Sequence, residues 1–460
     1  MYMKTWSKHR KGIYSALTRK RRELPVRVNG HVVEIKEGWK SVCIHGSPYD
    51  RGFAHGFLLY EELARTMEAY PFLIREKIDH TIEDYIAYSN KHIKPVVIKH
   101  FPEIYEEMEG IVAGANARNV HVTLDFLIAW NSHMSIQSQY IPGRRTKEEI
   151  HPGRCSAFIA TGSATEDGKI VMGHTTHTDF IEGQLSNIIM YVIPHKGMPF
   201  IMQTAAGYVA SVTDWFVCSS GIVGCETTIW GTNYEPQFGY PFFCRIRRAM
   251  QYATTLDEYA EIMQKNNAGD YACSWLFGDV NTNEIMLCEL GLTRTNIQKT
   301  GNGIYYGMNS TLDFDLRTYE TKDDKWNDIT ASTGSRNVRL NQLLYGEYFG
   351  RINIETAKKV LSDHYNPLTK TDVRNRLAVC VHAESDGHLK QGSYAMRGCT
   401  DCKIINADMA KEMAFYARFG AACGRTFSVK RHVKKHPKYK KWEPHVYDFK
   451  RYKWTKIAFT

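Results

Sequence analysis

The sequence predicts an α+β fold in which β-sheets stack on each other and helices lie outside them. Two observations lead to this prediction. Apolar residues recur at helical spacing from about residue 56 to residue 134, whereas after residue 154 strand-like blocks alternate with pairs of helices. Elements of this kind bury their apolar faces when sheets stack and helices cover the outside. With 460 residues, 43% of them hydrophobic, the chain can bury one large core or two ordinary ones.

The segment from residue 40 to residue 154 is predicted to be mainly helical and to end in an exposed loop. Its apolar residues at helical spacing are Phe57, Leu58, Leu59, Leu63 and Met67, and then Ile104, Met108, Ile111, Val112 and Ala115. The loop, within residues 137–154, contains QYIPGRRTKEEIHPGR, which has two Pro-Gly pairs, several charges and little to bury.

After the loop, strand and helix patterns alternate. Strands are predicted in CSAFIATG (155–162), GKIVMGHTTH (168–177), NIIMYVIPHKGMPFIMQT (187–204), GIVGCETTIWG (221–231) and SWLFGDVNTNEIMLCELG (274–291). Lys196-Gly197 and Asn281–Asn283 are predicted hairpin turns. Helices are predicted at about residues 240–253, 256–265, 336–345, 354–363 and 407–416.

The positive charge of the chain, +10 in total, is concentrated at its two ends. Residues 1–27 hold nine lysines and arginines against Glu23, and residues 427–460 hold eleven against two acidic residues. We therefore expect basic arms at residues 1–39 and 427–460, the second rich in aromatic residues, around an acidic body. Such arms are either solvated tails or contacts for an anionic membrane surface; a nucleic-acid partner is not expected.

The overall composition of the sequence does not decide the cellular compartment of the protein. Apolar patches such as residues 126–130 are far shorter than the roughly 18 residues of a membrane-spanning helix. The first residues are basic without an apolar stretch, so no secretory signal is visible. Eleven unevenly spaced cysteines do not form a dense disulfide framework, and mostly reduced thiols are expected.

Cys155 stands where the exposed loop meets the first strand. If the chain were cut between Arg154 and Cys155, the thiol would lie beside its own α-amine, whose ordinary pKa of about 7.7–8.0 lets it accept the thiol proton near neutral pH. Before cleavage the same thiol could attack the Arg154 carbonyl, given a well-held peptide. A buried structural cysteine is the commoner alternative for a cysteine that opens a strand.

Several blocks of this sequence resemble the phospholipase B-like proteins. They are GRCSAFIATG, GHTTHTDF (173–180), GYVASVTDWFVCSSGIVGCETTI (207–229) and FFCRIRRAMQYATTLDEYAEIMQKNNAGDYACSWLFGDV (242–280). The segments GSPYDRGFAHG (46–56) and MEGIVAGANARNVHVTLDFLIAWN (108–131) are similar to the related isopenicillin N acyltransferase-like hydrolases. The resemblance covers roughly residues 40–427 and leaves both basic ends out.

The resemblance implies an amino-terminal-nucleophile (Ntn) hydrolase. Its fold would be an αββα sandwich of two mainly antiparallel sheets, with residues 40–154 as a propeptide-like segment and residues 155–426 as the catalytic core. The chain would cut itself between Arg154 and Cys155, and Cys155 would become the nucleophile.

Carried over position by position, the resemblance implies further site residues. His174 would orient the amine or bind the leaving group. Asn309 would hold the tetrahedral oxyanion, a role in which a preorganised amide donor contributes roughly 3 kcal/mol. Arg336 would lie near the nucleophile, with Arg339 as the alternative register. One residue of the pair Thr227 and Thr228 would face the site. Each residue also has an ordinary structural explanation. His174 would be a polar residue at a strand end, and Asn309 a turn residue. Arg336 or Arg339 would lie on a solvated helix face, and the two threonines would be β-branched strand residues.

No metal or cofactor is expected from the motifs. Cys399 and Cys402 form a lone CxxC without a second pair, and His432 and His436 in HVKKH lack the glutamate of a zinc protease. Neither a phosphate-binding loop nor a GxSxG motif occurs.

Three functions remain open. The first is hydrolysis of acyl esters of (lyso)glycerophospholipids, which the phospholipase B-like blocks imply. The second is an amidohydrolase or acyltransferase acting on N-acyl small molecules, which the segments before the cysteine imply. The third is a non-catalytic protein whose basic arms bind an anionic membrane or nucleic acid.

Overall fold

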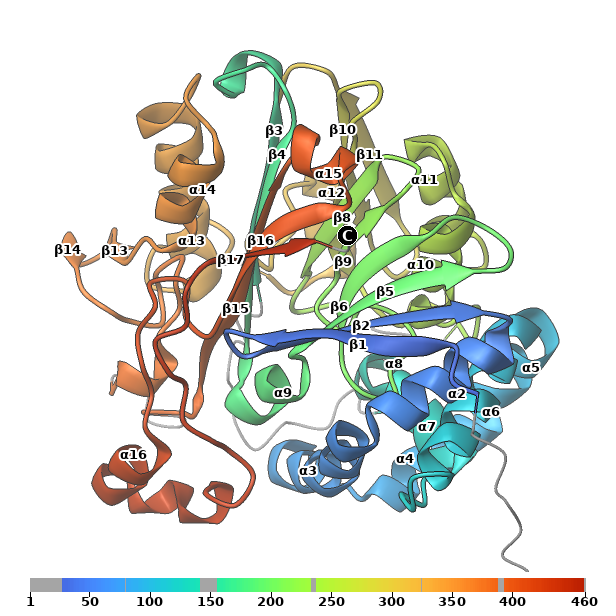
Figure 1. Cartoon of the computed structure of the whole chain (residues 1–460). Helices are drawn as coiled ribbons and strands as arrows, with labels where there is room; N and C mark the ends of the chain where they lie inside the picture. The colour runs from blue at the N-terminus through green and yellow to red at the C-terminus, as the bar shows by residue number, and fades with distance from the viewer. Residues whose placement is uncertain are drawn as a thin grey trace, which may run out of the picture.

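Two large β-sheets lie face to face at the centre of the molecule (Figure 1). The computed structural model describes residues 27–78, 80–140, 155–232, 237–323, 325–387 and 393–458. The six-stranded sheet is antiparallel throughout. In spatial order its strands are β12 (Gly303–Gly307), β3 (Cys155–Thr161), β4 (Val171–Asp179), β15 (Arg397–Asn406), β16 (Ala414–Phe419) and β17 (Thr455–Ala458).

The second sheet has nine strands and is antiparallel except where β2 pairs with β5. In spatial order its strands are β1 (Gly30–Lys36), β2 (Trp39–Gly46), β5 (Ile188–Pro194), β6 (Phe200–Thr204), β7 (Trp215–Cys218), β8 (Ile222–Thr228), β9 (Cys273–Asp279), β10 (Glu284–Leu290) and β11 (Thr295–Thr300). The hairpin turns predicted at Lys196-Gly197 and Asn281–Asn283 join β5 to β6 and β9 to β10.

The inner faces of the two sheets form one core. Alternate residues of β3, Ala157 and Ile159, pack there with Val223 and Cys225 of β8. The intervening β3 residues, Phe158 and Ala160, belong to a different cluster on the outer face. Every residue of β3 and β4 is therefore buried, since both faces of this sheet are covered.

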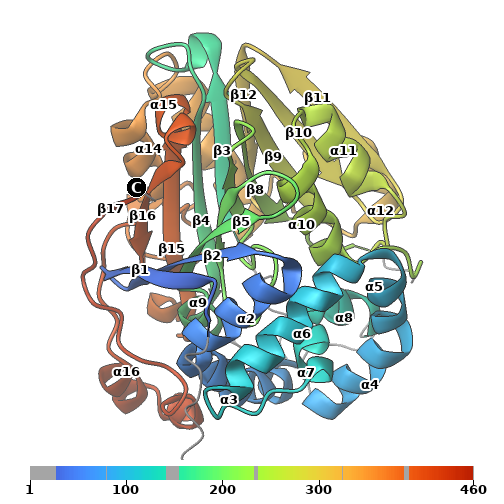
Figure 2. The same ribbon diagram turned by 45° about the vertical axis from the view of Figure 1, so that its right-hand side comes forward.

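Helices cover both outer faces. On the nine-stranded sheet lie α10 (Phe242–Tyr252) and α11 (Leu256–Gln264), and on the six-stranded sheet lie α13 (Ser332–Asn341) and α14 (Ile354–Leu361) (Figures 1 and 2). Shorter elements are α9 (Phe180–Leu185), α12 (Phe314–Glu320), α15 (Ala407–Lys411), α16 (Val429–Lys435) and the small sheet of β13 (Tyr365–Asn366) and β14 (Thr371–Asp372). The predicted α+β class and its αββα order of layers are confirmed.

Helices fill most of the segment before residue 141. They are α2 (Pro48–Leu58), α3 (Tyr60–Ile78), α4 (Ile82–His92), α5 (Lys94–His100), α6 (Pro102–Asn116), α7 (Leu124–Asn131) and α8 (His133–Tyr140). Helices α2 and α6 cross closely because glycines stand at the contact: a Cβ built at Gly52 would lie 1.9 Å from the carbonyl oxygen of Glu107. The same segment also supplies β1 and β2, which the periodicity did not predict.

We expect the two pieces of a chain cut before Cys155 to stay together. Strand β2, from the N-terminal piece, is hydrogen-bonded to β5 along its whole length, from Lys40↔Ile188 to Gly46↔Pro194. Native size-exclusion chromatography should give one peak that a denaturing gel resolves into two bands. Elution of the N-terminal piece by itself under native conditions would contradict this expectation.

The C-terminal residues, expected to form a basic arm, instead fold onto the body as far as residue 458. Strand β17 pairs with β16, and Lys441 forms an ion pair with Glu76 of α3 at 2.6 Å. Trp442 and Val446 join the same hydrophobic cluster as the inner faces of the sheets. The aromatic residues between the lysines thus supply buried contacts. Of the N-terminal arm, residues 1–26 lie outside the described residues, and residues 30–36 form β1.

The helix predicted at residues 407–416 is wrong after residue 411. Helix α15 ends at Lys411, Met413 takes a left-handed backbone conformation with φ 52°, and β16 begins at Ala414. Pairing with β15 and β17 on both sides overrides the local helical pattern.

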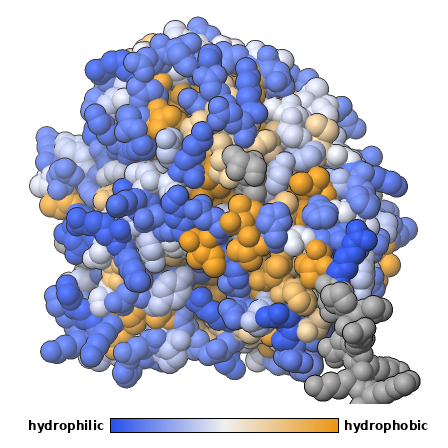
Figure 3. All heavy atoms as spheres, in the orientation of Figure 1, coloured by the Kyte–Doolittle hydropathy of each residue, from blue (hydrophilic) through white to orange (hydrophobic). Residues whose placement is uncertain are grey.

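The face of the molecule shown in Figure 3 is mostly hydrophilic, with a group of hydrophobic side chains near its centre, where β1 lies in the same view. Strand β1 is an edge strand, and it exposes Val32, Val33 and Ile35. No helix in the described parts of the chain is long and apolar enough to cross a bilayer.

Candidate active site

Cys155 is the first residue of β3, between β12 and β4 in the six-stranded sheet. Because strand side chains alternate, its thiol lies on the same face as Ala157 and Ile159, between the two sheets. The residue is 5% exposed. Arg154, the other side of the predicted cleavage point, lies outside the described residues, as does the rest of the predicted loop from residue 141.

Two distant residues hold the main chain of Cys155. Its N–H donates to Asn309 Oδ1 at 3.0 Å, and Arg336 Nη1 donates to its carbonyl oxygen. Arg336 Nη2 also donates to Asn309 Oδ1 at 3.0 Å, so the three residues form one closed hydrogen-bonded group. The structure thus brings together the predicted nucleophile on β3 and two of its predicted partners, Asn309 in the turn after β12 and Arg336 on α13.

Asn309 is positioned by β8 and by its own backbone. Its φ of 75° lies in the left-handed region, which asparagine tolerates better than most residues. Its Nδ2 donates to the carbonyl oxygen of Thr228 at 3.0 Å. The side-chain oxygen, rather than the amide N–H of the expected oxyanion donor, therefore faces the Cys155 nitrogen.

Arg336 is a buried cation with neutral partners. It is fully buried on α13, and its remaining bonds go to Ser332 on the same helix and to Ser156 Oγ at 3.2 Å. No ion pair within the described residues includes it. Burial lowers the pKa of Arg336 to about 10, which leaves it charged at neutral pH. A buried guanidinium without a carboxylate favours the appearance of negative charge nearby.

The two threonines of β8 point in opposite directions. Thr227 faces the six-stranded sheet, since a Cβ built at Gly307 of β12 would lie 2.2 Å from its Oγ1. Thr228 Oγ1 is instead hydrogen-bonded to the hydroxyl of Tyr271 at 2.5 Å. Of the predicted pair, Thr227 is thus the one between the sheets. Its Oγ1 is buried and has no hydrogen-bond partner among the described residues.

His174 bridges the two sheets beside the site. It lies on β4 opposite Ala157, and its Nε2 is 3.0 Å from the carbonyl oxygen of Glu226 on β8. A carbonyl only accepts, so Nε2 carries the hydrogen and Nδ1 holds the lone pair. Burial lowers the pKa of His174 well below its ordinary value, so the ring is neutral at physiological pH. The bond to β8 fits a positioning residue better than a general base.

Burial keeps the Cys155 thiol protonated. It raises the pKa of the thiol well above the ordinary value, and the negative charges of Glu226 and Asp214 raise it further. The buried pair Lys403 and Asp401 also lies near enough to act on the thiol, in opposite directions. The thiol therefore needs a nearby proton acceptor to become a nucleophile. Lys403 and Asp401 belong to no motif that predicted the site, and they lie about 250 residues after Cys155 in the sequence.

We expect Arg336→Lys to slow both processing and hydrolysis on the order of 100-fold. Lysine keeps a positive charge but lacks the planar fork that binds Cys155 and Asn309 at once. Rates of chain cleavage and substrate turnover would measure the effect. Arg339→Lys is the matched control on the same helix: Arg339 pairs with Asp363 near the surface at 2.7 Å. Equal loss in both variants would contradict a specific role for Arg336.

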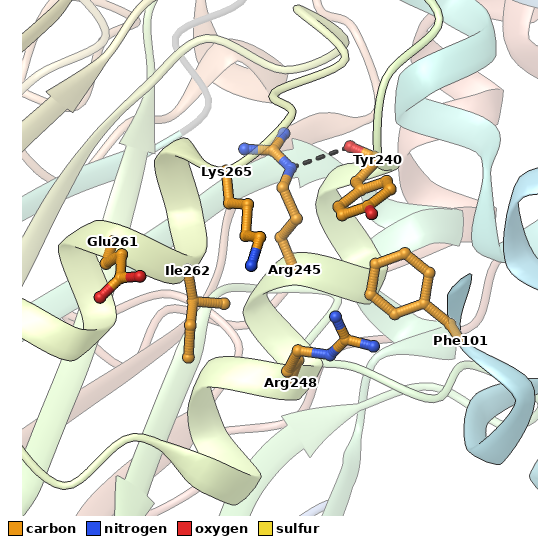
Figure 4. A pocket seen from close by; sticks show the side chains of 7 residues that line it. All are labelled: Phe101, Tyr240, Arg245, Arg248, Glu261, Ile262 and Lys265. Carbon is orange, nitrogen blue, oxygen red and sulfur yellow. Dashed lines mark hydrogen bonds between the residues drawn. The ribbon is translucent and has the colours of Figure 1, made fainter.

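The cavities described for the molecule lie away from Cys155. One, of about 100 Å³, lies between Phe101 and the helices α10 and α11, and Figure 4 shows Arg245, Arg248 and Lys265 around it. A second, much smaller one lies beside Trp130 and His133. Within the described residues, the side chains that could ligate a metal ion also gather elsewhere, and none of the predicted catalytic residues is among them.

Comparison with known proteins gives distant likenesses. No protein-family model matches the chain. An uncharacterized protein of Archaeoglobus fulgidus is 24% identical over 257 residues, which are 54% of this chain but only 42% of that protein. A cysteine-to-alanine mutant of the conjugated bile acid hydrolase of Clostridium perfringens matches 57% of this chain and 89% of its own, with 10% identity and a TM-score of 0.33. An arginine-to-leucine variant of the same hydrolase matches 59% and 83%, with 9% identity and a TM-score of 0.28.

With both TM-scores below 0.5, neither structural likeness decides the activity of this chain. The αββα order of layers follows from the sheets and helices themselves. Membership of the phospholipase B-like family stays a prediction.

Proposed function

We propose that the chain is a self-processing Ntn hydrolase in which Cys155 attacks acyl ester or amide carbonyls. Two hydrogen bonds to the main chain of Cys155 are the main support for the proposal. Asn309 Oδ1 accepts its N–H, and Arg336 donates to its carbonyl oxygen. Any buried main-chain N–H needs an acceptor, but here the acceptor is a side chain that would stay beside the nitrogen if cleavage turned it into an amine. A nucleophile that uses its own amine as the base needs such an acceptor.

Processing comes first. The Cys155 sulfur bonds to the Arg154 carbonyl carbon and loses its proton, the C–N bond breaks, and the Cys155 nitrogen takes up that proton as an amine. Water then opens the thioester, which releases the Arg154 carboxylate and restores the thiol. The positive charge of Arg336 stabilises the thiolate and the tetrahedral oxyanion that form on the way.

Turnover repeats the same chemistry on a substrate. The free amine takes the thiol proton, and the thiolate attacks the acyl carbon. The amine then gives its proton to the leaving oxygen or nitrogen as the acyl bond breaks. Water hydrolyses the resulting thioester with the amine as base. Asn309 Oδ1 would accept an N–H of this amine and so direct its lone pair toward the sulfur.

Two substrate classes follow from the resemblance. The blocks after Cys155 favour fatty acyl esters of (lyso)glycerophospholipids, and the segments before it favour N-acyl amides. The chemistry above serves both, so a direct comparison decides between them. Processed protein is incubated with a lysophospholipid and with an N-acyl amino acid, and released fatty acid is measured against Cys155→Ala. If processed wild type releases no fatty acid from either substrate, the proposed function fails.

The cationic face of α16 favours contact with an anionic membrane. Lys430, Arg431, Lys434 and Lys435 are exposed there, while Val429 and Val433 are buried against the body. Such a face adds about 1 kcal/mol per lysine or arginine near an anionic surface. Vesicles of phosphatidylcholine with and without phosphatidylserine, sedimented with the protein, test this contact. Equal binding to both would contradict it.

A further inference from the structure

Two cysteines and two histidines meet on the outer side of the six-stranded sheet, away from Cys155. They are His364, just after α14, Cys380 and His382, in the loop after β14, and Cys423, after β16. One ligand atom from each lies within 4.8 Å of all the others. Cys380 and His382 are buried, and His364 and Cys423 are half-buried.

His382 stands at the centre of this cluster. Its Nε2 is 3.4 Å from the sulfur of Cys380 and 3.4 Å from the sulfur of Cys423. Its Nδ1 is 2.8 Å from Glu384 Oε1, so Nδ1 donates to the carboxylate and Nε2 is the nitrogen available to a metal ion. The carboxylate on the far nitrogen is the arrangement that orients a metal-ligating histidine.

His364 supplies a second, independent observation. Its Nε2 is buried without a regular hydrogen bond among the described residues, and its ring interacts with the thiol of Cys423. The rings of His364 and His382 are 5.0 Å apart, and one ring nitrogen of His364 lies within 4.8 Å of the other three ligand atoms. A buried polar atom without a partner costs free energy unless another group satisfies it.

We propose that His364, Cys380, His382 and Cys423 bind one zinc ion. Two thiolates and two imidazoles are a tetrahedral ligand set that suits zinc better than magnesium, calcium or manganese. Zinc bonds of about 2.0–2.3 Å place tetrahedral ligand atoms roughly 3.3–3.8 Å apart, which the two sulfur contacts of His382 already match. The widest pair has to move closer by about 1 Å.

Four protein ligands leave no open position, so the ion would be structural rather than catalytic. It would join the end of α14, the loop before residue 383 and the turn after β16. This loop also touches the active-site side of the molecule, because Ser156 Oγ donates to the carbonyl oxygen of Val379 at 3.5 Å and Ser332 Oγ to that of Arg376 at 3.1 Å. The ion would thus stabilise the loop that is hydrogen-bonded to Ser156 and to α13, the helix that carries Arg336.

Metal content and spectroscopy test the site. Full-length protein purified without chelator from zinc-supplemented medium should hold about one zinc per chain, measured by inductively coupled plasma mass spectrometry. Cobalt(II) exchanged into it should show the intense visible bands and thiolate charge-transfer bands of a tetrahedral site. Cys423→Ser and His364→Gln, both at half-buried positions, should lose most of the zinc and lower the melting temperature. Neither readout depends on hydrolysis.

Cys402→Ser is the matched control, since Cys402 is a buried thiol of the same hydrophobic cluster but not a ligand. It should keep its zinc. Zinc-free wild-type protein, or equal zinc in Cys423→Ser, His364→Gln and wild type, would overturn the proposal. So would a Cys380–Cys423 disulfide, seen as a mass lower by two hydrogens and as thiols closed to alkylation.

Discussion

Intact-mass spectrometry of Cys155→Ala is expected to give one polypeptide, whereas the wild-type chain gives two that meet between Arg154 and Cys155. Without the sulfur, nothing at this position can accept the Arg154 acyl group, so cleavage is abolished rather than slowed. Hydrolysis of any acyl substrate should fall to background in the same variant.

Alanine is a clean replacement here. The bonds to Asn309 and Arg336 use the main-chain nitrogen and oxygen of residue 155, which alanine keeps. Loss of one buried sulfur costs about 1–2 kcal/mol, too little to unfold a domain of this size. A lower melting temperature with normal secondary structure would confirm that the variant is folded.

Cys225→Ala is the matched control for this experiment. Cys225 lies on β8, on the same inner face and equally buried, but no hydrogen bond described here holds its main chain to Asn309 or Arg336. It should be processed as the wild type is. Two pieces from Cys155→Ala would contradict the proposed nucleophile. One piece from wild type that still hydrolyses substrate would contradict the need for a free amine.

The strands around Cys155 were predictable because their signals are local. Continuous apolar runs with turn residues between them predicted β3, β5, β6, β9 and β10 close to their observed bounds. Pairing across the chain was not predictable. Strand β1 comes from the predicted basic arm, β2 from the start of the segment predicted to be mainly helical, and β16 from the predicted end of a helix. Strand β2 depends on β5, far away in sequence, and β1 and β16 depend on the strands beside them.

The residues of the candidate site were predictable, but their orientation and long-range neighbours were not. The resemblance named Cys155, Asn309 and Arg336, which the fold brings into contact although they are up to 181 residues apart. The orientation of the two threonines could not be predicted from the sequence. The register of β8 decides that Thr227, and not Thr228, points between the sheets. The cysteine and histidine cluster was missed because only Cys380 and His382 are close in sequence, and a single Cys-x-His pair is a weak signal while His364 and Cys423 come from other segments.

Glu107→Ala is expected to lower the free energy of unfolding by about 3–5 kcal/mol, the largest stability effect that we predict. Glu107, on α6, is 1% exposed and binds two buried arginines. Its Oε2 is 2.8 Å from Arg51 Nη2 of α2 and 2.9 Å from Arg247 Nη2 of α10. Alanine would leave both guanidinium groups buried without their shared carboxylate.

The position of this triad explains why the effect should reach the whole molecule. It joins two helices of the N-terminal segment to a helix on the nine-stranded sheet. Burial by itself would raise the pKa of Glu107, but Arg247 and Arg51 outweigh burial and hold it below the ordinary value. A lowered pKa means that the stabilisation is complete above the unfolded-state pKa and is lost as the pH falls through the folded-state pKa.

Urea unfolding followed by tryptophan fluorescence at neutral pH measures the difference. Glu106→Ala, at an exposed neighbouring position on α6, should change stability by less than about 0.5 kcal/mol. Glu107→Gln, which keeps the size and one acceptor oxygen, should lie between the two because it removes the charge alone. If Glu107→Ala unfolded at the same urea concentration as Glu106→Ala, the triad would not stabilise the join between the N-terminal segment and the sheet. That join would then depend on β2, on helix packing and on other hydrogen bonds, such as those of Asn131 to Gly207 and Val209.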